Sequence, residues 1–103
     1  MYAKLRLELD NAGIDYRQSS NFQGIIMEHV DTCYAEELHG NQLNPYSQYL
    51  VRENEKTVWH INAVTEEAYE KILLPMAKLN EVMVRQKQMT VGIVGRNIEL
   101  HDE

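Results

Sequence analysis

The sequence has one cysteine, two prolines and five glycines, and it lacks any long apolar run. A single cysteine, Cys33, cannot form an intramolecular disulfide, and residues 1–10 alternate polar and apolar side chains where a signal peptide needs a continuous apolar stretch. Both features predict a cytoplasmic, reducing environment. Because a membrane helix needs roughly 20 apolar residues, we expect no membrane span. So little proline and glycine also excludes a collagenous chain or one dominated by linkers.

Basic residues are scarce as well. The chain has 10 Lys and Arg against 16 Asp and Glu, which gives a formal net charge of -6. This balance disfavours non-specific binding of a polyanion over the whole surface, although a local basic patch could still bind one. A length of 103 residues with 44% hydrophobic and 25% charged residues predicts one globular domain.

The spacing of the apolar residues predicts six elements of secondary structure. Alternating apolar and polar residues indicate strands, and apolar residues three or four apart indicate helices. In chain order these are a strand over residues 2–9, a helix over 20–39, strands over 46–52 and 57–61, a helix from residue 65 and a strand over 81–85. We expect residues 53–56 to form a four-residue turn. Residues 89–94 either prolong the last strand or form a further one.

A few residues are expected to set the helix ends. Ser20 begins the first helix as its N-cap, with Gln23 three residues later as in a capping box, and Gly40 ends it in a left-handed conformation. Thr65 caps the second helix. Pro75 should kink that helix or end it, because proline lacks an N–H donor and clashes with the preceding turn.

The order strand, helix, strand, strand, helix, strand predicts an α+β protein with the ferredoxin-like βαββαβ topology. In this fold an antiparallel four-stranded sheet carries two helices on one face, and both crossovers are right-handed. We expect residues 1–103 to form a single domain of this kind. Thr57, Trp59 and Ile61 should share one face of their strand.

The sheet face that the helices leave open is the first candidate site. Four basic residues could line it: Lys4, Arg6, Arg85 and Lys87. His60 joins them if Trp59 points inward. RNA-binding modules of this topology bind RNA along such a face. The alternative is a solvated face or one that another domain covers, and the sheet lacks the paired aromatic residues of an RNA recognition motif.

One spacing in the first helix could hold a metal. His29, Cys33 and Glu37 follow one another at intervals of four, so a continuous helix would place them on one face. Cys33 also belongs to the apolar stripe of that helix, and structural zinc sites draw their ligands from separate elements. We therefore predict no metal or other cofactor. No residue near Cys33 identifies a base that would make it a catalytic nucleophile.

His39 is the candidate acid or base. It lies at the end of the first predicted helix beside an irregular segment, where an imidazole, which titrates near neutral pH, is exposed to a ligand. Tyr46 and Ser47 follow within eight positions and could bring hydroxyl groups to the same place. The alternative is structural, since a histidine near a helix C-terminus interacts favourably with the helix dipole.

Short segments of the chain occur in an order that resembles a known family. After the strand that ends at Leu9 they are FQGII (22–26), ELHG (37–40), NPYS (44–47), VWHI (58–61) and TEEA (65–68). This order is similar to that of the N-terminal half of the CRISPR-associated endoribonucleases that process precursor CRISPR RNA, which belong to the RAMP superfamily. The resemblance covers about residues 3–95.

The resemblance implies a protein of two tandem ferredoxin-like domains, of which this chain is the N-terminal one. Such a protein binds CRISPR repeat RNA and cleaves it without a metal, because a ribose 2′-hydroxyl attacks the adjacent phosphate and leaves a 2′,3′-cyclic phosphate and a 5′-hydroxyl. His39 matches the histidine that acts as acid or base in several members, with Tyr46 as a candidate partner. The CRISPR effector complex is an implied partner, and exposed sheet edges could produce a homodimer.

Two positions depart from the family pattern. Archaeal members that use a tyrosine, a histidine and a lysine have the tyrosine where this chain has Met27 and the lysine where it has Gln42. His39 must then act with other groups, and the candidates are His29, Tyr34 and Tyr46. The family's glycine-rich loop lies in the second domain, so we expect this sequence to be part of a longer protein.

Two other functions remain open. A non-catalytic RAMP-like subunit would hold guide RNA without cutting it, and the departures at the tyrosine and lysine positions favour it. A dimeric ferredoxin-like regulatory domain that binds a metabolite would need an apolar sheet face, which the basic residues of the first strand do not predict.

Overall fold

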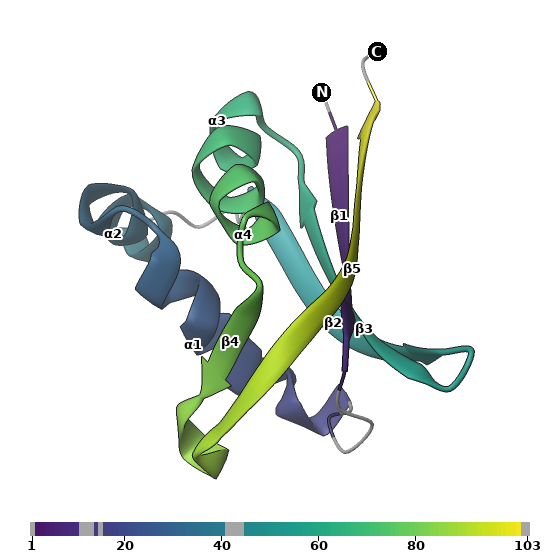
Figure 1. Ribbon diagram of the computed structural model, residues 1–103. Coiled ribbons are helices and arrows are strands. Elements are labelled where there is room, and N and C mark those ends of the chain that lie inside the picture. The colour runs from purple at the N-terminus through teal and green to yellow at the C-terminus, as the bar shows by residue number, and fades with distance from the viewer. Residues whose placement is uncertain (1, 11–13, 15, 41–44, 102–103) are drawn as a thin grey trace.

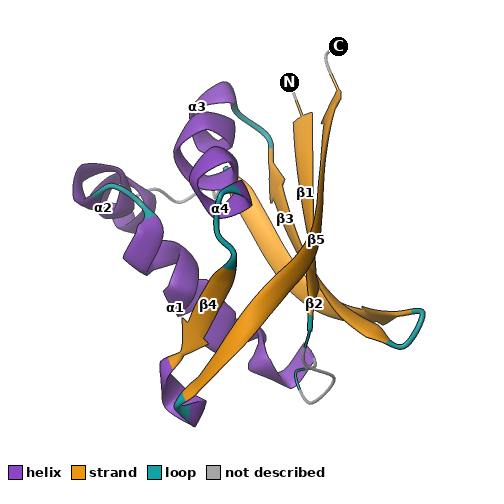
Figure 2. Ribbon diagram, in the orientation of Figure 1, coloured by secondary structure: helices purple, strands orange, loops and turns teal. Residues whose placement is uncertain are grey.

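A computed structural model describes residues 2–10, 14, 16–40 and 45–101, except for the side chains of Tyr16 and His39. The chain forms two layers, a curled antiparallel sheet and a set of helices that cover one of its faces (Figures 1 and 2). The helices and strands are β1 (Tyr2–Leu9), α1 (Ser19–His29), α2 (Thr32–Gly40), β2 (Tyr46–Glu53), β3 (Lys56–Ala63), α3 (Glu66–Ala68), α4 (Leu74–Ala77), β4 (Glu81–Val84) and β5 (Met89–His101).

The sheet has five strands in the order β2-β3-β1-β5-β4. The predicted α+β class is confirmed, but the sheet has one strand more than the four that were expected. The difference lies in β5, which pairs with β4 over residues 89–92 and with β1 over residues 93–101. The second half of β5 is largely exposed, so its sequence lacks the apolar alternation from which a strand is predicted.

The core lies between the sheet and the helices. The residues of β1 alternate as predicted, with Ala3, Leu5 and Leu7 fully buried on the helix side. Trp59 on β3 is also fully buried and meets Phe22 of α1 edge to face, with ring centroids 4.8 Å apart. Thr57 and Ile61 are buried as well, so the prediction that these three residues share one face of β3 is confirmed.

The predicted first helix is two helices. Val30 has an extended backbone, and Asp31 caps the N-terminus of α2. The Asp31 carboxylate accepts from the Cys33 N–H at 3.0 Å, and its carbonyl accepts from the Ala35 N–H at 2.9 Å. Cys33 is exposed, so its predicted place in the apolar stripe is wrong. The predicted cap at Ser20 is wrong as well, because α1 already begins one residue earlier.

The second predicted helix runs past its proline. Thr65 caps it as predicted, because its hydroxyl oxygen accepts from the Ala68 N–H at 3.1 Å. Between α3 and α4 the residues Tyr69–Leu73 form a wide π-helical turn, in which the N–H of Leu74 bonds to the carbonyl of Tyr69. This widening lets Pro75 follow without breaking the helix. Within the described residues, no helix has the length and apolar character needed to cross a membrane.

The β2–β3 hairpin closes with a two-residue turn. Asn54 and Glu55 have φ angles of 51° and 67°, which is the type I′ conformation that matches the twist of paired strands. Glu53 and Lys56 therefore face each other as the last pair of the ladder. The predicted turn over residues 53–56 was therefore too long, because Glu53 belongs to β2 and Lys56 belongs to β3.

Candidate nucleic-acid interface

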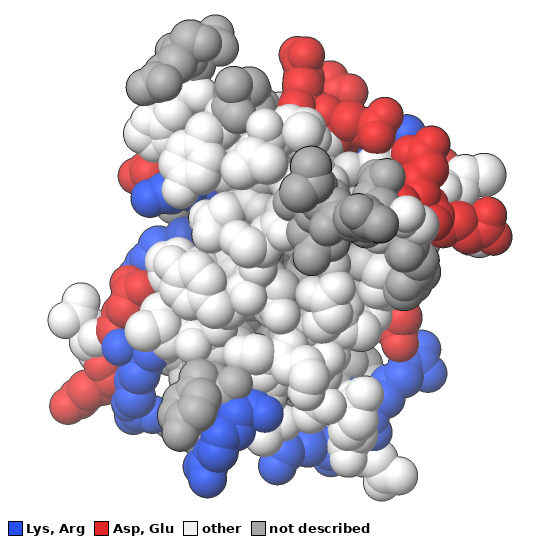
Figure 3. Space-filling model, turned by 180° about the vertical axis from the view of Figure 1, so that it is seen from behind, with Lys and Arg blue, Asp and Glu red and all other residues white. Residues whose placement is uncertain are grey.

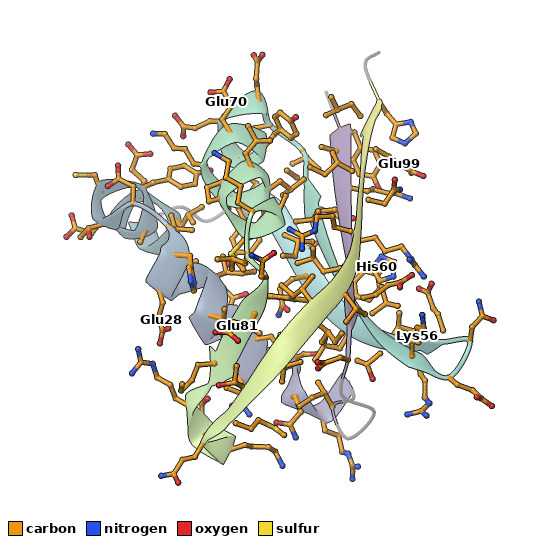
Figure 4. The ribbon with its side chains drawn as sticks, in the orientation of Figure 1. Glu28, Lys56, His60, Glu70, Glu81 and Glu99 are labelled. Carbon is orange, nitrogen blue, oxygen red and sulfur yellow. The ribbon has the colours of Figure 1, made fainter. Side chains whose placement is uncertain are left out.

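The open face of the sheet carries polar side chains from four strands. Strand register places Arg6 of β1 between His60 of β3 and Asn97 of β5, and His60 lies opposite Tyr49 of β2. Figure 4 shows His60, Lys56 and Glu99 on the side of the sheet that faces away from the helices. Alternation along β1 and β3 thus brings together residues that lie far apart in sequence.

Glu53 is the centre of an ion-pair network on this face. Its Oε1 lies 2.9 Å from Nη2 and 3.2 Å from Nε of Arg6, and its Oε2 lies 2.7 Å from Nε2 of His60. Arg6 also meets Glu8, with 2.8 Å between Nη1 and Oε1, and Lys56 lies 3.6 Å from the other oxygen of Glu8. The side chains are only partly exposed, 33% for Arg6 and 16% for His60.

These contacts favour the ionised forms of Glu53, Glu8 and Arg6. Hydrogen bonds from His60 and then from Arg6 lower the pKa of Glu53 below its ordinary value. The hydrogen bond from Arg6 likewise lowers the pKa of Glu8, and the two carboxylates raise the pKa of Arg6. At neutral pH both carboxylates are therefore charged, and together they offset the charges of Arg6 and Lys56.

A hollow of about 180 Å³ lies beside the network. It is lined by Lys4, Arg6, Tyr49, His60, Asn97 and Glu99. The rings of Tyr49 and His60 stack with centroids 4.7 Å apart and 13° between their planes, and Tyr49 is 46% exposed. Stacked aromatic rings beside cationic side chains are the groups with which proteins bind single-stranded nucleic acid.

The predicted basic residues fall into two separate groups. Lys4 and Arg6 lie together on the open face with His60, as predicted. Arg85 and Lys87 instead lie in the turn between β4 and β5, because β4 ends at Val84. Arg85 pairs with Glu28 of α1 at 2.7 Å, on the helix-covered side of the sheet. The expectation that all four residues share one face is therefore wrong.

Tyr46, one of the two predicted catalytic residues, begins β2 and is nearly buried. It is 8% exposed, and Gln23 donates a hydrogen bond from its side-chain amide to the tyrosine hydroxyl. Burial raises the pKa of this hydroxyl. The other predicted residue, His39, has its backbone in the last turn of α2, and its side chain lies outside the described part of the structure.

Acidic residues dominate the end of the molecule where His39 lies. Five exposed glutamates belong to α2, α3 and the turn that follows: Glu36, Glu37, Glu66, Glu67 and Glu70. Seen from behind, acidic side chains gather at that end and basic ones along the opposite end (Figure 3). Tyr34 of α2 also lies there, and burial, followed by the nearby Glu67, raises its pKa.

The predicted spacing of His29, Cys33 and Glu37 does not persist. The break after α1 puts His29 on one helix and the other two residues on the next, so they do not follow one another on a single helical face. The Nδ1 atom of His29 lies 2.9 Å from the carbonyl oxygen of Ile25 in its own helix.

Sequence reasoning missed Glu53 and Tyr49. Both occupy outward positions of β2, Tyr49 two residues and Glu53 six residues after Ser47 along the same alternating pattern. Extending that alternation to a two-residue turn would have placed both side chains on the open face, with Tyr49 opposite His60 and Glu53 opposite Lys56.

Comparisons with known proteins give the family. No protein-family model matches the chain. The CRISPR-associated endoribonuclease Cas6 of Streptococcus thermophilus is 31% identical over 61 residues, which are 59% of this chain and 25% of that protein. The protein of the same name from Mycobacterium tuberculosis (strain CDC 1551 / Oshkosh) is 30% identical over 82 residues, 77% of this chain and 26% of its own length.

The chain belongs to the Cas6 family. The resemblance that the order of short segments indicated is confirmed. The chain spans about a quarter of the length of the curated Cas6 relatives that it matches.

Proposed function

We propose that this Cas6-family chain is the N-terminal ferredoxin-like domain of a two-domain endoribonuclease, which binds CRISPR repeat RNA and cleaves it without a metal to give guide RNA. The observation that carries the proposal is the similarity to proteins named Cas6 endoribonucleases over 59% and 77% of the chain. The CRISPR effector complex, as recipient of the guide RNA, and a homodimer remain predictions.

The proposed reaction needs one base and one acid. The base takes the proton of a ribose 2′-hydroxyl, the bond from O2′ to phosphorus forms, the bond from phosphorus to O5′ breaks, and the acid gives O5′ a proton. An imidazole suits either role at neutral pH, and we assign one of them to His39. Tyr46 has a raised pKa and is protonated at neutral pH, so it fits the acid better than the base.

We assign RNA binding first to Lys4 and Arg6. Both lie on the open face beside a stacked aromatic pair, and neither lies among the exposed glutamates of α2 and α3. Arg85 and Lys87, in the turn between β4 and β5, would contact a different stretch of the RNA backbone. Such phosphate contacts give affinity that falls as the salt concentration rises.

Cleavage of labelled CRISPR repeat RNA in EDTA tests the proposal. The complete protein that contains this chain is compared with its His39→Ala and His101→Ala variants. Loss of a general acid or base should lower the cleavage rate constant by about 10²- to 10⁴-fold. The His101→Ala control, which removes an exposed histidine of β5, should cleave at the wild-type rate. Wild-type cleavage by the His39→Ala variant would contradict the role of His39.

One observation favours a second candidate, a guide-RNA-holding subunit without nuclease activity. The hydroxyl of Tyr46 is buried and already bonded to Gln23, and Met27 and Gln42 replace the tyrosine and lysine of the archaeal catalytic set. This candidate predicts that the complete protein binds repeat RNA and leaves it intact. The regulatory-domain alternative needs an apolar open face, whereas this face carries Lys4 and Arg6.

A further inference from the structure

Glu53 holds two proton-donating side chains of the open face with its two carboxylate oxygens. Oε1 lies within 3.2 Å of both Nε and Nη2 of Arg6, and Oε2 lies 2.7 Å from Nε2 of His60. Because an ionised carboxylate only accepts hydrogen bonds, His60 donates its Nε2–H to it. A guanidinium edge and an imidazole N–H that converge in this way also bind the oxygens of a phosphate group.

We propose that Arg6 and His60 form a phosphate-binding site and that Glu53 competes with phosphate for it. The inference rests on the proposed function only in taking RNA as the source of the phosphate. The carboxylate of Glu53 takes the place of the ligand in the unbound protein. The site becomes available when this one side chain moves aside.

The position of Glu53 allows that movement. It is the last residue of β2, directly before the turn at Asn54 and Glu55, and its side chain is one third exposed. Arg6 would not be left without an anionic partner, because Glu8 holds its Nη1 at 2.8 Å. Displacing Glu53 therefore costs contacts at the surface of the protein and leaves the core unchanged.

The surroundings of the pair suit a nucleotide. The hollow extends from Arg6 and His60 to Lys4 and Asn97, which supply a second cation and an amide. Tyr49 stacks on His60 and offers an exposed ring beside the phosphate site. A phosphate on Arg6 and His60 would thus place the attached nucleoside next to groups that bind bases by stacking and hydrogen bonding.

The charge balance predicts how a variant behaves. In the wild type the charges of Glu8 and Glu53 offset those of Arg6 and Lys56. Glu53→Gln leaves one positive charge in excess and replaces the carboxylate with a neutral amide, whose single oxygen binds the guanidinium edge and the imidazole N–H less strongly. The variant should therefore bind phosphate ligands more tightly than the wild type does.

The test measures binding of a fluorescein-labelled oligouridylate of about eight nucleotides by fluorescence anisotropy over a range of salt concentrations. We expect Glu53→Gln to lower Kd by about tenfold, the value of one charge-assisted contact. The plot of log K against log salt should steepen by about 0.7, as for one added phosphate contact to a single strand. An unchanged Kd would overturn the proposal.

Two further variants separate a specific site from a general effect of charge. Glu55→Gln removes the same charge from the same hairpin, but Glu55 lies in the turn, and none of the described contacts of Arg6 or His60 involves it. The Kd of this variant should stay within about twofold of wild type. Arg6→Gln in the Glu53→Gln background should abolish the gain. Equal gains for Glu53→Gln and Glu55→Gln, or a gain that survives the loss of Arg6, would contradict a site at Arg6.

A measurement on the wild-type chain covers the case in which Glu53→Gln does not fold. The NMR signals of the Arg6 Nε–H and His60 ring should shift on titration with inorganic phosphate and stay constant with sodium chloride of equal ionic strength. Arg6 and His60 signals that do not shift when phosphate is added would overturn the proposal. Tighter binding of the oligonucleotide assigns the site to RNA, whereas a response to inorganic phosphate or uridine monophosphate without tighter binding of the oligonucleotide would overturn the proposal as a site for RNA.

The outcome is independent of the cleavage test. Oligouridylate carries no CRISPR repeat and needs no cutting, so Glu53→Gln reports on the phosphate site alone. Repeat cleavage with no effect of Glu53→Gln on binding would leave the proposed function standing and remove this inference. Tighter binding by Glu53→Gln without repeat cleavage would support this inference and contradict the proposed nuclease function.

Discussion

Asp10 and Gly92 form two hydrogen bonds that join the residue after β1 to β5. We expect the methyl group added by Gly92→Ala to break one of them. The N–H of Gly92 donates to Oδ1 of Asp10 at 3.0 Å, and the N–H of Asp10 donates to the carbonyl of Gly92 at 3.0 Å. A Cβ at position 92 would lie 2.5 Å from Oδ2 of Asp10, far inside ordinary contact. In Gly92→Ala the carboxylate must therefore turn away and lose its hydrogen bond.

The magnitude follows from two opposing effects. A hydrogen bond to a charged group contributes about 1.5–3 kcal/mol, and the exposure of Asp10 favours the lower end. Replacing Gly by Ala without strain stabilises by about 0.4–1 kcal/mol, because it restricts the unfolded chain. Gly92 has no positive φ, so this gain applies. We expect Gly92→Ala to lower the free energy of unfolding by about 1 kcal/mol.

In the Asp10→Ala background, Gly92→Ala should raise the free energy of unfolding instead of lowering it. The three nearest atoms to the added Cβ all belong to Asp10, and the farthest of these lies 3.6 Å away, so without this carboxylate the methyl group meets ordinary contacts. There Gly92→Ala should raise the free energy of unfolding by about 0.4–1 kcal/mol. Urea titration at 25 °C, followed by the fluorescence of the buried Trp59, measures all four proteins.

Gly24→Ala is the matched control for this cycle. Gly24 lies in α1 with nothing within 4 Å of an added Cβ, so this change should stabilise by up to about 1 kcal/mol in either background. The reasoning is refuted if Gly92→Ala destabilises equally with and without the Asp10 carboxylate.

Two further predictions concern the network and a helix cap. Because hydrogen bonds lower the pKa of Glu53 in the folded state, the stability that they supply is fully present above the ordinary carboxylate pKa of about 4.3 and is lost as the pH falls through the lower folded value. Urea midpoints measured from neutral pH down to about pH 3 should therefore fall more steeply for the wild type than for Glu53→Gln, and parallel curves would speak against the network. Thr65→Ala should cost about 1 kcal/mol through loss of the cap of α3, whereas Ser20→Ala should have little effect, and equal costs in thermal unfolding would be inconsistent with the observed caps.

Alternating apolar and polar residues predicted the strands that have one buried and one exposed face. Alternation gave the observed bounds of β1 and the inward faces of both β1 and β3, whereas β3 extends one residue before and two residues after the predicted range 57–61. The last part of β5 has no such signal, because it is largely exposed and its pairing depends on β1 far away in sequence. The break before α2 was missed because Val30 continues the helical apolar stripe while Asp31 starts a new cap.

The same physics explains the outcome for the candidate site. Lys4 and Arg6 were found because alternation alone places them outward. Glu53 was missed because the predicted four-residue turn included it, whereas the observed two-residue turn leaves it on β2, where its side chain reaches Arg6. Arg85 was misplaced because its strand ends one residue earlier, so its side chain meets α1. The role of His39 stays a prediction.

We propose that this Cas6-family chain belongs to a metal-independent nuclease for CRISPR repeat RNA. The most direct test maps the ends of the products that the complete protein forms from repeat RNA in EDTA. We expect cleavage at one position, with a 2′,3′-cyclic phosphate on one product and a 5′-hydroxyl on the other. Bound but intact RNA, or products with a 5′-phosphate and a free 3′-hydroxyl, would contradict it.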